Sequence, residues 1–173
     1  MLNRICATLA LLVVTSAVVA QEHTNTNSDS GGVRLAPENG GFIAIMPAKP
    51  EEQLTTKEGV TTHVYIAKLD RSVYLAAYTD YAFTVEDPQK ELEADRDNFN
   101  KVLEAKLLTT RNITFDGRQG IEFTSETAAA NIKSRVFIRG NRIFQQAVLI
   151  GKDTDQAKAV ETFFNSFAFT TKN

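Results

Sequence analysis

Apolar and polar positions alternate along the N-terminal half of the chain in a way that predicts strands. A short apolar run at residues 42–46 lies between glycines and prolines and predicts a buried strand. Residues 60–69 and 73–81 alternate between the two kinds of side chain and are rich in β-branched and aromatic residues. A turn near Asp70-Arg71 would join them, so the pattern predicts a hairpin.

Two later segments repeat their apolar positions at helical spacing. The first covers residues 88–106, with Asp87 as its predicted N-cap and Pro88 at its first position, where proline is tolerated. The second follows Asp153 or Thr154, either of which can cap it. Its broad apolar face is formed by Ala157, Val160, Phe163, Phe164 and Phe167.

Four strands are predicted between these helices. Asp116-Gly117 divides one hairpin, in which Gly117 and Gly120 relieve a tight turn or bulge. Gly140-Asn141 divides the other, between residues 131–139 and 142–150. A two-residue turn there sets Phe137 opposite Phe144 and Ile138 opposite Ile143. Apolar pairs then fall on both faces, which places these two strands at the centre of a sheet covered on both sides. The fold class predicted is α+β, an antiparallel β-sheet covered by helices in an α/β/α sandwich.

The N-terminus predicts export. Arg4 precedes an apolar run of moderate length, and small residues precede Gln21, which is the layout of a secretory signal peptide over residues 1–20. An uncleaved anchor is the alternative, but the run is short for a bilayer span. Residues 21–34 are mostly polar and predict a disordered linker. Residues 35–170 then form a single domain in the periplasm or outside the cell, without stable membrane insertion.

Composition removes several classes of function. The chain has one cysteine, Cys6, inside the predicted signal, so disulfide exchange, thiol catalysis and Cys-ligated metal are excluded for the exported domain. Cys6 also lies on the wrong side of the apolar run to carry a lipid. A formal net charge of −2 argues against binding to nucleic acid. The sequence also lacks phosphate-binding glycine loops and metal-ligand motifs, so we expect no cofactor and no metal.

Candidate catalytic groups are few. His63 lies mid-strand in the predicted hairpin, opposite or next to Tyr78, and a histidine in that position is more often structural than catalytic. An enzyme with an unrecognised site near His63, Tyr78 and Asp80 is therefore an alternative and not the first choice. Carboxylates four residues apart on the first helix, Glu91 with Asp95 and Glu93 with Asp97, alternate with basic residues and are interpreted as a solvated face.

One group of residues predicts a binding surface. Lys133, Arg135, Arg139 and Arg142 lie in and around one hairpin, and Arg139 and Arg142 flank its turn. Like charges that face each other are unfavourable, so the group is a candidate site for an acidic partner. Charged hairpin tips also keep sheet edges from aggregating, and that alternative stays open.

Several short motifs, in order, resemble the PsbP-like superfamily, in particular its small secreted bacterial members of unknown function. They are Gly41-Phe42, Met46-Pro47, Tyr78-Thr79-Asp80-Tyr81, Gly120-Ile121-Glu122-Phe123, Gly140 to Gln145, and Phe163 with Ser166-Phe167. The superfamily includes an extrinsic subunit of photosystem II and a nuclear Ran-binding protein. The resemblance implies an antiparallel sheet between helical layers and a role without catalysis.

The sequence thus predicts an exported, non-enzymatic accessory or protein-binding domain. Its expected partner is another envelope or extracellular protein, with an acidic one as a candidate. A carrier of a small apolar ligand is a further alternative, because both predicted helices present phenylalanines that could line a cavity under the sheet.

Overall fold

The computed structural model describes residues 32–57 and 60–170, which form ten strands and two helices. The strands are β1 (Val33–Leu35), β2 (Phe42–Met46), β3 (Glu51–Lys57), β4 (Val60–Leu69), β5 (Ser72–Asp80), β6 (Lys106–Phe115), β7 (Arg118–Glu126), β8 (Ala130–Arg139), β9 (Arg142–Gly151) and β10 (Ala168–Phe169). The helices are α1 (Pro88–Val102) and α2 (Ala157–Asn165). The predicted signal peptide, residues 1–20, and residues 21–31 of the predicted linker lie outside this description.

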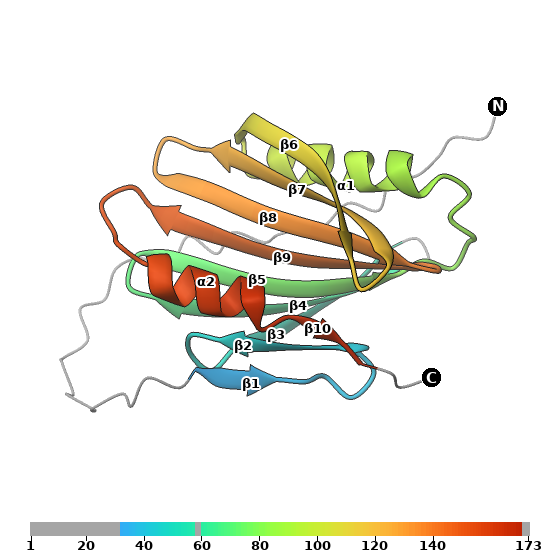
Figure 1. The fold of residues 1–173 in the computed structure, drawn as a ribbon, viewed down its shortest axis with the longest axis horizontal. Coiled ribbons are helices and arrows are strands. Elements are labelled where there is room, and N and C mark those ends of the chain that lie inside the picture. The colour runs from blue at the N-terminus through green and yellow to red at the C-terminus, as the bar shows by residue number, and fades with distance from the viewer. Residues whose placement is uncertain (1–31, 58–59, 171–173) are drawn as a thin grey trace.

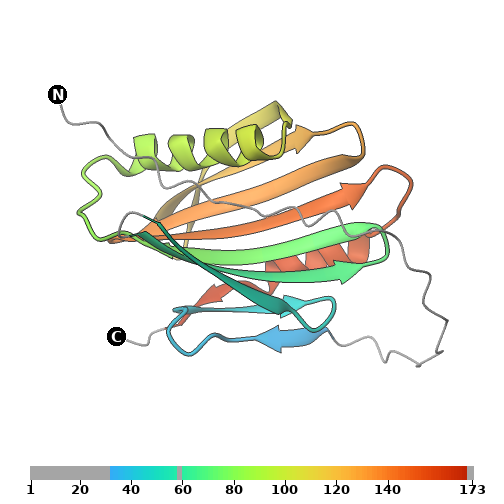
Figure 2. The ribbon, with the colours of Figure 1, turned by 180° about the vertical axis from the view of Figure 1, so that it is seen from behind.

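The described strands form two antiparallel sheets. Seven of them pair in the order β3-β4-β5-β9-β8-β7-β6, which we call the large sheet. The small sheet consists of β1, β2 and β10, with β2 in the middle. Figure 1 shows α2 in front of the large sheet with the small sheet beside it, and Figure 2 shows α1 along the opposite face. The predicted α+β class, an antiparallel sheet covered by helices, is confirmed.

The large sheet separates two apolar cores. On one face Leu92 and Phe99 of α1 pack against Ile121, Phe123 and Val136. On the other face α2 and the small sheet supply the side chains, and the buried aromatic residues there are Phe42, Tyr65, Tyr74, Tyr78, Phe137, Phe144, Phe163, Phe164 and Phe167. Burial of this apolar area from water is the main force holding the layers together.

The central hairpin has the register that the sequence predicts. Phe137 is opposite Phe144 and Ile138 is opposite Ile143. Phe144 lies in the core under α2, whereas Ile143 lies in the core under α1. Strand β9 is accordingly in the middle of the large sheet and is buried on both faces.

The predicted turns also form, with one difference in the role of a glycine. Asp116 and Gly117 have positive φ values of 49° and 70°, and Gly140 has a φ of 60°. Gly120 serves neither turn nor bulge, because the irregularity in this hairpin lies between Leu107 and Thr109. A Cβ on Gly120 would instead lie 2.5 Å from the carbonyl oxygen of Val136. Gly120 is therefore required by close packing against β8.

Both helices differ from prediction at one end. Asp87 caps α1 as expected, since its carboxylate accepts a hydrogen bond from the amide of Lys90 at 3.1 Å. The helix ends at Val102, and Glu104, with a φ of 52°, redirects the chain into β6. The predicted cap of α2 at Asp153 or Thr154 is wrong. That helix begins at Ala157, whose amide donates to the carboxylate of Asp155 at 3.2 Å.

Three strands were not predicted. β3 has no apolar alternation, and it forms by pairing along β4 at the edge of the large sheet. β1 and β10 are only a few residues long and are specified by pairing with β2. β1 includes Val33 and Arg34, which lie at the end of the segment predicted to be a disordered linker.

Candidate functional site

The four basic residues singled out in the sequence lie on the α2 face of the large sheet, but they form two separate groups. Lys133 and Arg135 lie beside α2, where their cationic groups are 5.1 Å and 5.0 Å from the centre of the Phe164 ring. Arg139 and Arg142 are opposite each other at the β8–β9 turn. The structure therefore does not present them as one continuous patch.

Arg135 has an internal carboxylate partner. Its Nε donates to Oε2 of Glu122 at 2.7 Å, and Arg111 donates to Oε1 of the same carboxylate at 2.6 Å. Burial alone would raise the pKa of Glu122, but the hydrogen bonds from Arg135 and Arg111 outweigh it and hold that pKa below its ordinary value. The charge of Arg135 is thus balanced within the fold.

Arg142 joins three parts of the chain. Its guanidinium donates to both carboxylate oxygens of Asp80, at 2.6 Å and 2.7 Å, and to the backbone carbonyl of Asn39 at 2.6 Å. It also lies 4.6 Å from the centre of the Tyr78 ring. A bidentate pair of this kind is geometrically specific. The side chain of Arg142 is used to hold β9, β5 and the loop before β2 together.

Arg139 differs from the other two arginines because no carboxylate among the described residues pairs with it. Its Nη1 donates to the carbonyl of Thr170 at 3.2 Å, and its guanidinium lies over Phe144 and Phe169 at 5.5 Å and 5.6 Å. Partial burial lowers the pKa of Arg139 below its ordinary value, and the charges of neighbouring arginines add to the effect.

Arg118 is a neighbour that sequence reasoning missed. It follows the β6–β7 turn, pairs with Asp116 and lies 4.7 Å from the centre of the Phe169 ring. Arg118 lies near Arg139 because β7 is adjacent to β8 in the large sheet. No local sequence pattern predicts that these two strands are neighbours. Arg118, Arg139 and Arg142 bring three guanidinium groups to one end of the large sheet, and we call them the arginine cluster.

Gly41 allows the loop that enters β2 to lie against the arginine cluster. It has a φ of 72°, and a Cβ at its position would lie 2.7 Å from Nη2 of Arg139. The loop that enters β2 therefore passes directly against the guanidinium. This contact gives a physical reason for one of the glycines in the sequence motifs.

The alternative catalytic residues are also brought together. His63 is opposite Tyr78, and their rings stack with centroids 4.4 Å apart. Nδ1 of His63 lies 3.0 Å from Oε1 of Glu52, which also accepts a hydrogen bond from the hydroxyl of Tyr65 at 2.8 Å. Glu52 was missed because it lies on β3, the strand that the sequence did not predict.

The surroundings of His63 restrict the catalytic chemistry that this second group of residues can perform. Hydrogen bonds from His63 and Tyr65 lower the pKa of Glu52, so its carboxylate stays ionised and can orient the imidazole. Burial raises the pKa of Tyr65 and of Tyr78, which makes both hydroxyls poor nucleophiles at neutral pH. Asp80 cannot act freely as a base, because Arg142 occupies both of its oxygens.

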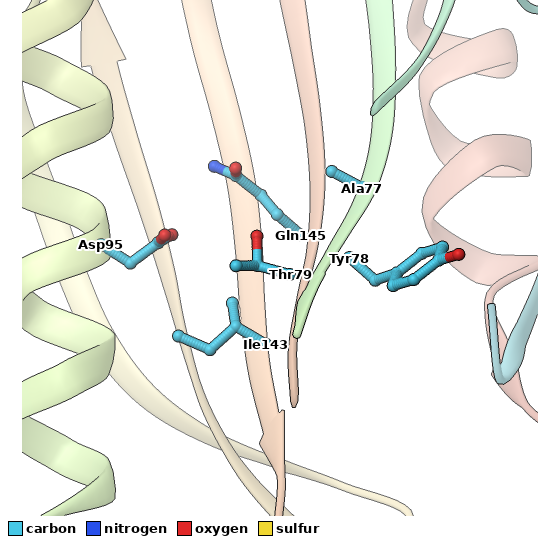
Figure 3. A pocket seen from close by; sticks show the side chains of 6 residues that line it. All are labelled: Ala77, Tyr78, Thr79, Asp95, Ile143 and Gln145. Atoms are coloured by element: carbon cyan, nitrogen blue, oxygen red, sulfur yellow. The ribbon is translucent and has the colours of Figure 1, made fainter. Parts of the chain in front are cut away.

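The paired carboxylates of α1 divide into two kinds. Glu93 accepts a hydrogen bond from Gln89 at 2.7 Å and Asp97 one from Arg96 at 2.8 Å, as expected on a polar surface. The solvated-face interpretation is wrong for Asp95, whose carboxyl group points toward the large sheet (Figure 3). The hollow there, lined by Thr79 and Gln145 among others, leaves no room for a small-molecule ligand.

Three further observations concern the part of the chain that the structure describes. No three His, Cys, Asp or Glu side chains in it lie close enough together to hold a metal ion. The helices in residues 32–57 and 60–170 are too short or too polar to span a bilayer. The phenylalanines of the two helices were candidates to line a ligand cavity. Those of α1 and α2 are buried against other core side chains; they are Phe99, Phe163 and Phe164.

The architecture, an antiparallel sheet with α1 on one face and α2 with a small sheet on the other, is a PsbP-like α+β fold. The chain is similar to cyanobacterial PsbP (CyanoP) from Synechocystis sp. PCC 6803, known from a solution structure. The two share 11% sequence identity with a TM-score of 0.58, over 86% of this chain and 98% of that one. The fold implied by the sequence motifs is confirmed.

Other comparisons add little. A crystal structure from Bacteroides thetaiotaomicron VPI-5482 aligns with a TM-score of 0.38 and 11% identity, over 82% of this chain and half the length of that one. No protein-family model matches the chain. No curated protein matches it either. At these identities the likeness to solved structures describes the fold and does not assign an activity.

Proposed function

We propose that the protein is an exported accessory domain that acts by binding another protein in the periplasm or outside the cell, without catalysis. The signal-like pattern of residues 1–20 supports export. The PsbP-like fold supports an accessory role. The observation that carries the proposal is the arginine cluster, in which Arg139 has no carboxylate partner among the described residues.

The arginine cluster has the properties of a contact for an acidic surface. Partial burial and the charges of Arg118 and Arg142 lower the pKa of Arg139, and the carboxylate of Asp116 offsets this only in part. A carboxylate from a partner would relieve both effects through charge-assisted hydrogen bonds. Arginine and aromatic side chains are also the residue types that dominate the energetics of protein interfaces, and the guanidinium groups of Arg118 and Arg139 both lie over the ring of Phe169.

We restrict the proposed contact to part of the predicted group of basic residues. Arg142 and Arg135 have internal carboxylate partners in Asp80 and Glu122, so we assign them a supporting role. Lys133 lies beside α2, away from the arginine cluster. Arg139, with Arg118 beside it, is therefore the proposed point of contact.

The test uses a variant that reverses the charge of Arg139. The purified protein and its Arg139→Glu variant are used to capture proteins from an envelope fraction. Arg71→Glu, in the β4–β5 turn, is the control of equal charge change, because the ion pair of Arg71 with Asp153 is exposed. We expect an acidic protein to be retained by the parent and the control but not by Arg139→Glu. Retention by all three would overturn the proposal. The parent is also mixed with vesicles that contain anionic lipid, and binding to these vesicles without retention of any protein would overturn the proposal as well.

A second candidate function rests on the contact between Glu52 and His63. A carboxylate that holds Nδ1 of a histidine fixes the ring orientation and leaves Nε2 to accept a proton, as in general-base catalysis. Glu52→Gln should then reduce any hydrolytic activity found and His63→Gln should abolish it. An activity unchanged in both variants would exclude this site.

A further inference from the structure

Asp95 occupies a position on α1 that normally holds an apolar side chain. Leu92 and Phe99, on the adjacent turns of the helix, are 0% and 1% exposed and belong to the core under α1. Asp95 follows Leu92 by three residues and precedes Phe99 by four, so it lies on the same stripe of the helix. Figure 3 shows its carboxyl group directed at Thr79, Ile143 and Gln145 of the large sheet.

One oxygen of the Asp95 carboxyl group is buried without a hydrogen-bond partner among the described residues. Although the residue as a whole is half-buried, this oxygen, Oδ2, is shielded from solvent. The polar groups opposite it are engaged elsewhere. The amide of Gln145 donates to the hydroxyl of Ser134 at 3.1 Å, and the hydroxyl of Thr79 pairs with that of Thr62 at 3.1 Å.

Among residues 32–57 and 60–170, no cation offsets a negative charge at this position. The faces of β5, β6, β7, β8 and β9 that lie under α1 carry apolar, hydroxyl and amide side chains. On α1 itself the nearby charge that acts on Asp95 is Glu91, which has the same sign. Arg96, the next residue along, is directed to Asp97 and to the hydroxyl of Thr110 on β6.

We propose that Asp95 is a pH-sensitive contact that docks α1 more tightly on the large sheet in acid than at neutral or alkaline pH. When protonated, the carboxyl group is neutral and fits an uncharged interface. When ionised, it leaves a shielded negative charge without a partner, which opposes docking.

The electrostatics give the pH range in which this contact changes. Burial, helped by the charge of Glu91, raises the pKa of Asp95 to about 7. In the unfolded chain the group has its ordinary pKa of 3.8, so between these two values the folded state holds a proton that the unfolded state has lost. Stability from this residue is therefore greatest in acid, falls as the pH rises toward 7, and stays low above it.

The test compares the parent protein with Asp95→Asn, which keeps the shape of the side chain and cannot ionise. Urea midpoints are measured at pH 5 and pH 8, with Asp97→Asn as the control on the exposed side of α1. We expect the parent and the control to lose stability between the two pH values by clearly more than Asp95→Asn does. Equal pH dependence in all three proteins would overturn the proposal.

A second measurement does not depend on the variant folding. Amide hydrogen exchange of α1 in the parent protein, corrected for intrinsic exchange rates, reports how often the helix opens at each pH. We expect opening to be more frequent at pH 8 than at pH 5 in α1 and unchanged in α2. An α1 whose opening does not depend on pH would contradict the proposal even if Asp95→Asn could not be purified.

Discussion

Arg142 and Asp80 are directly opposite each other on β9 and β5, and the guanidinium binds both oxygens of the carboxylate. The same guanidinium donates to the carbonyl of Asn39 at 2.6 Å. One side chain thus connects two adjacent strands of the large sheet to the loop that enters the small sheet. Arg142 was a candidate binding residue in the sequence, and its contacts give it a structural role that can be tested.

Arg142→Gln should lower the free energy of unfolding by about 2 kcal/mol, because it removes hydrogen bonds to a charged group and leaves Asp80 unpaired. Urea denaturation at pH 7 measures the change. Arg139→Gln is the matched variant, because Arg139 is opposite Arg142 on the adjacent strand β8 and donates a single hydrogen bond among the described residues, to the carbonyl of Thr170 at 3.2 Å. It should lose less than about 1 kcal/mol. Equal losses in the two variants would show that the ion pair with Asp80 adds nothing.

The glycines of the β6–β7 hairpin predict two different responses to substitution. Gly120→Ala should cost about 2 kcal/mol or more, because its Cβ would press on the backbone carbonyl of Val136 and on the ring of Phe137. Gly117 has open space around it but a φ of 70°, so Gly117→Ala should cost about 1 kcal/mol.

Substitution by asparagine separates the steric cause at Gly120 from the backbone-conformation cause at Gly117. Asparagine tolerates positive φ, so Gly117→Asn should fold almost as stably as the parent, whereas Gly120→Asn should be worse than Gly120→Ala. Thermal unfolding of the four variants gives the order. If Gly120→Asn were as stable as Gly117→Asn, this would contradict the explanation that Gly120 is required by close packing of β7 against β8.

Local signals were sufficient for the parts of the fold that depend on neighbours in sequence. Asp116-Gly117 and Gly140-Asn141 each specify a turn through their own backbone preferences, and Asp87 with Pro88 specifies the start of α1. The apolar pairs on both faces of β8 and β9 placed this hairpin at the centre of the sheet. These features need no knowledge of which strands lie side by side.

The remainder depends on contacts between residues far apart in the chain. β3 is polar and becomes a strand because β4 offers it an edge, so Glu52 and its contact with His63 could not be predicted. Arg118 lies close enough for its charge to act on Arg139 only because of the order of the strands in the large sheet. The spacing of Asp95 from Leu92 and Phe99 places it on the apolar stripe of α1, but the charged residues around it in the sequence favoured a solvated interpretation. The packing of α1 on the large sheet shows that its carboxyl group faces inward.

Glu122 should contribute to stability in a pH-dependent way. Its pKa is lowered in the folded protein, so its contribution is present above the ordinary value of 4.5 and is lost as the pH falls through the lower folded value. Glu122→Gln should cost about 1 to 2 kcal/mol at pH 7 and should flatten the loss of stability in acid. Urea unfolding at pH 3 and pH 7 measures both effects.

The control for this prediction is Glu126→Gln on the same strand. Glu126 faces a distant cation, with 3.9 Å to the amine of Lys106, and its side chain is 37% exposed. A surface pair of this kind contributes little to stability, so the variant should behave like the parent at both pH values. An acid sensitivity of Glu122→Gln equal to that of Glu126→Gln would contradict the assigned role of Arg135 and Arg111.

Ser166 joins α2 to the small sheet, and its removal should weaken that joint specifically. Its hydroxyl accepts a hydrogen bond from the amide of Ile45 on β2 at 2.7 Å and donates to the carbonyl of Phe163 at 2.9 Å. Ser166→Ala would leave the amide of Ile45 without this acceptor, at a cost of about 1 to 2 kcal/mol. Asn165→Ala, at the exposed neighbouring residue, should cost much less. Hydrogen exchange at the amide of Ile45 should become faster in Ser166→Ala alone, and unchanged exchange there would mean that apolar packing holds the small sheet without this contact.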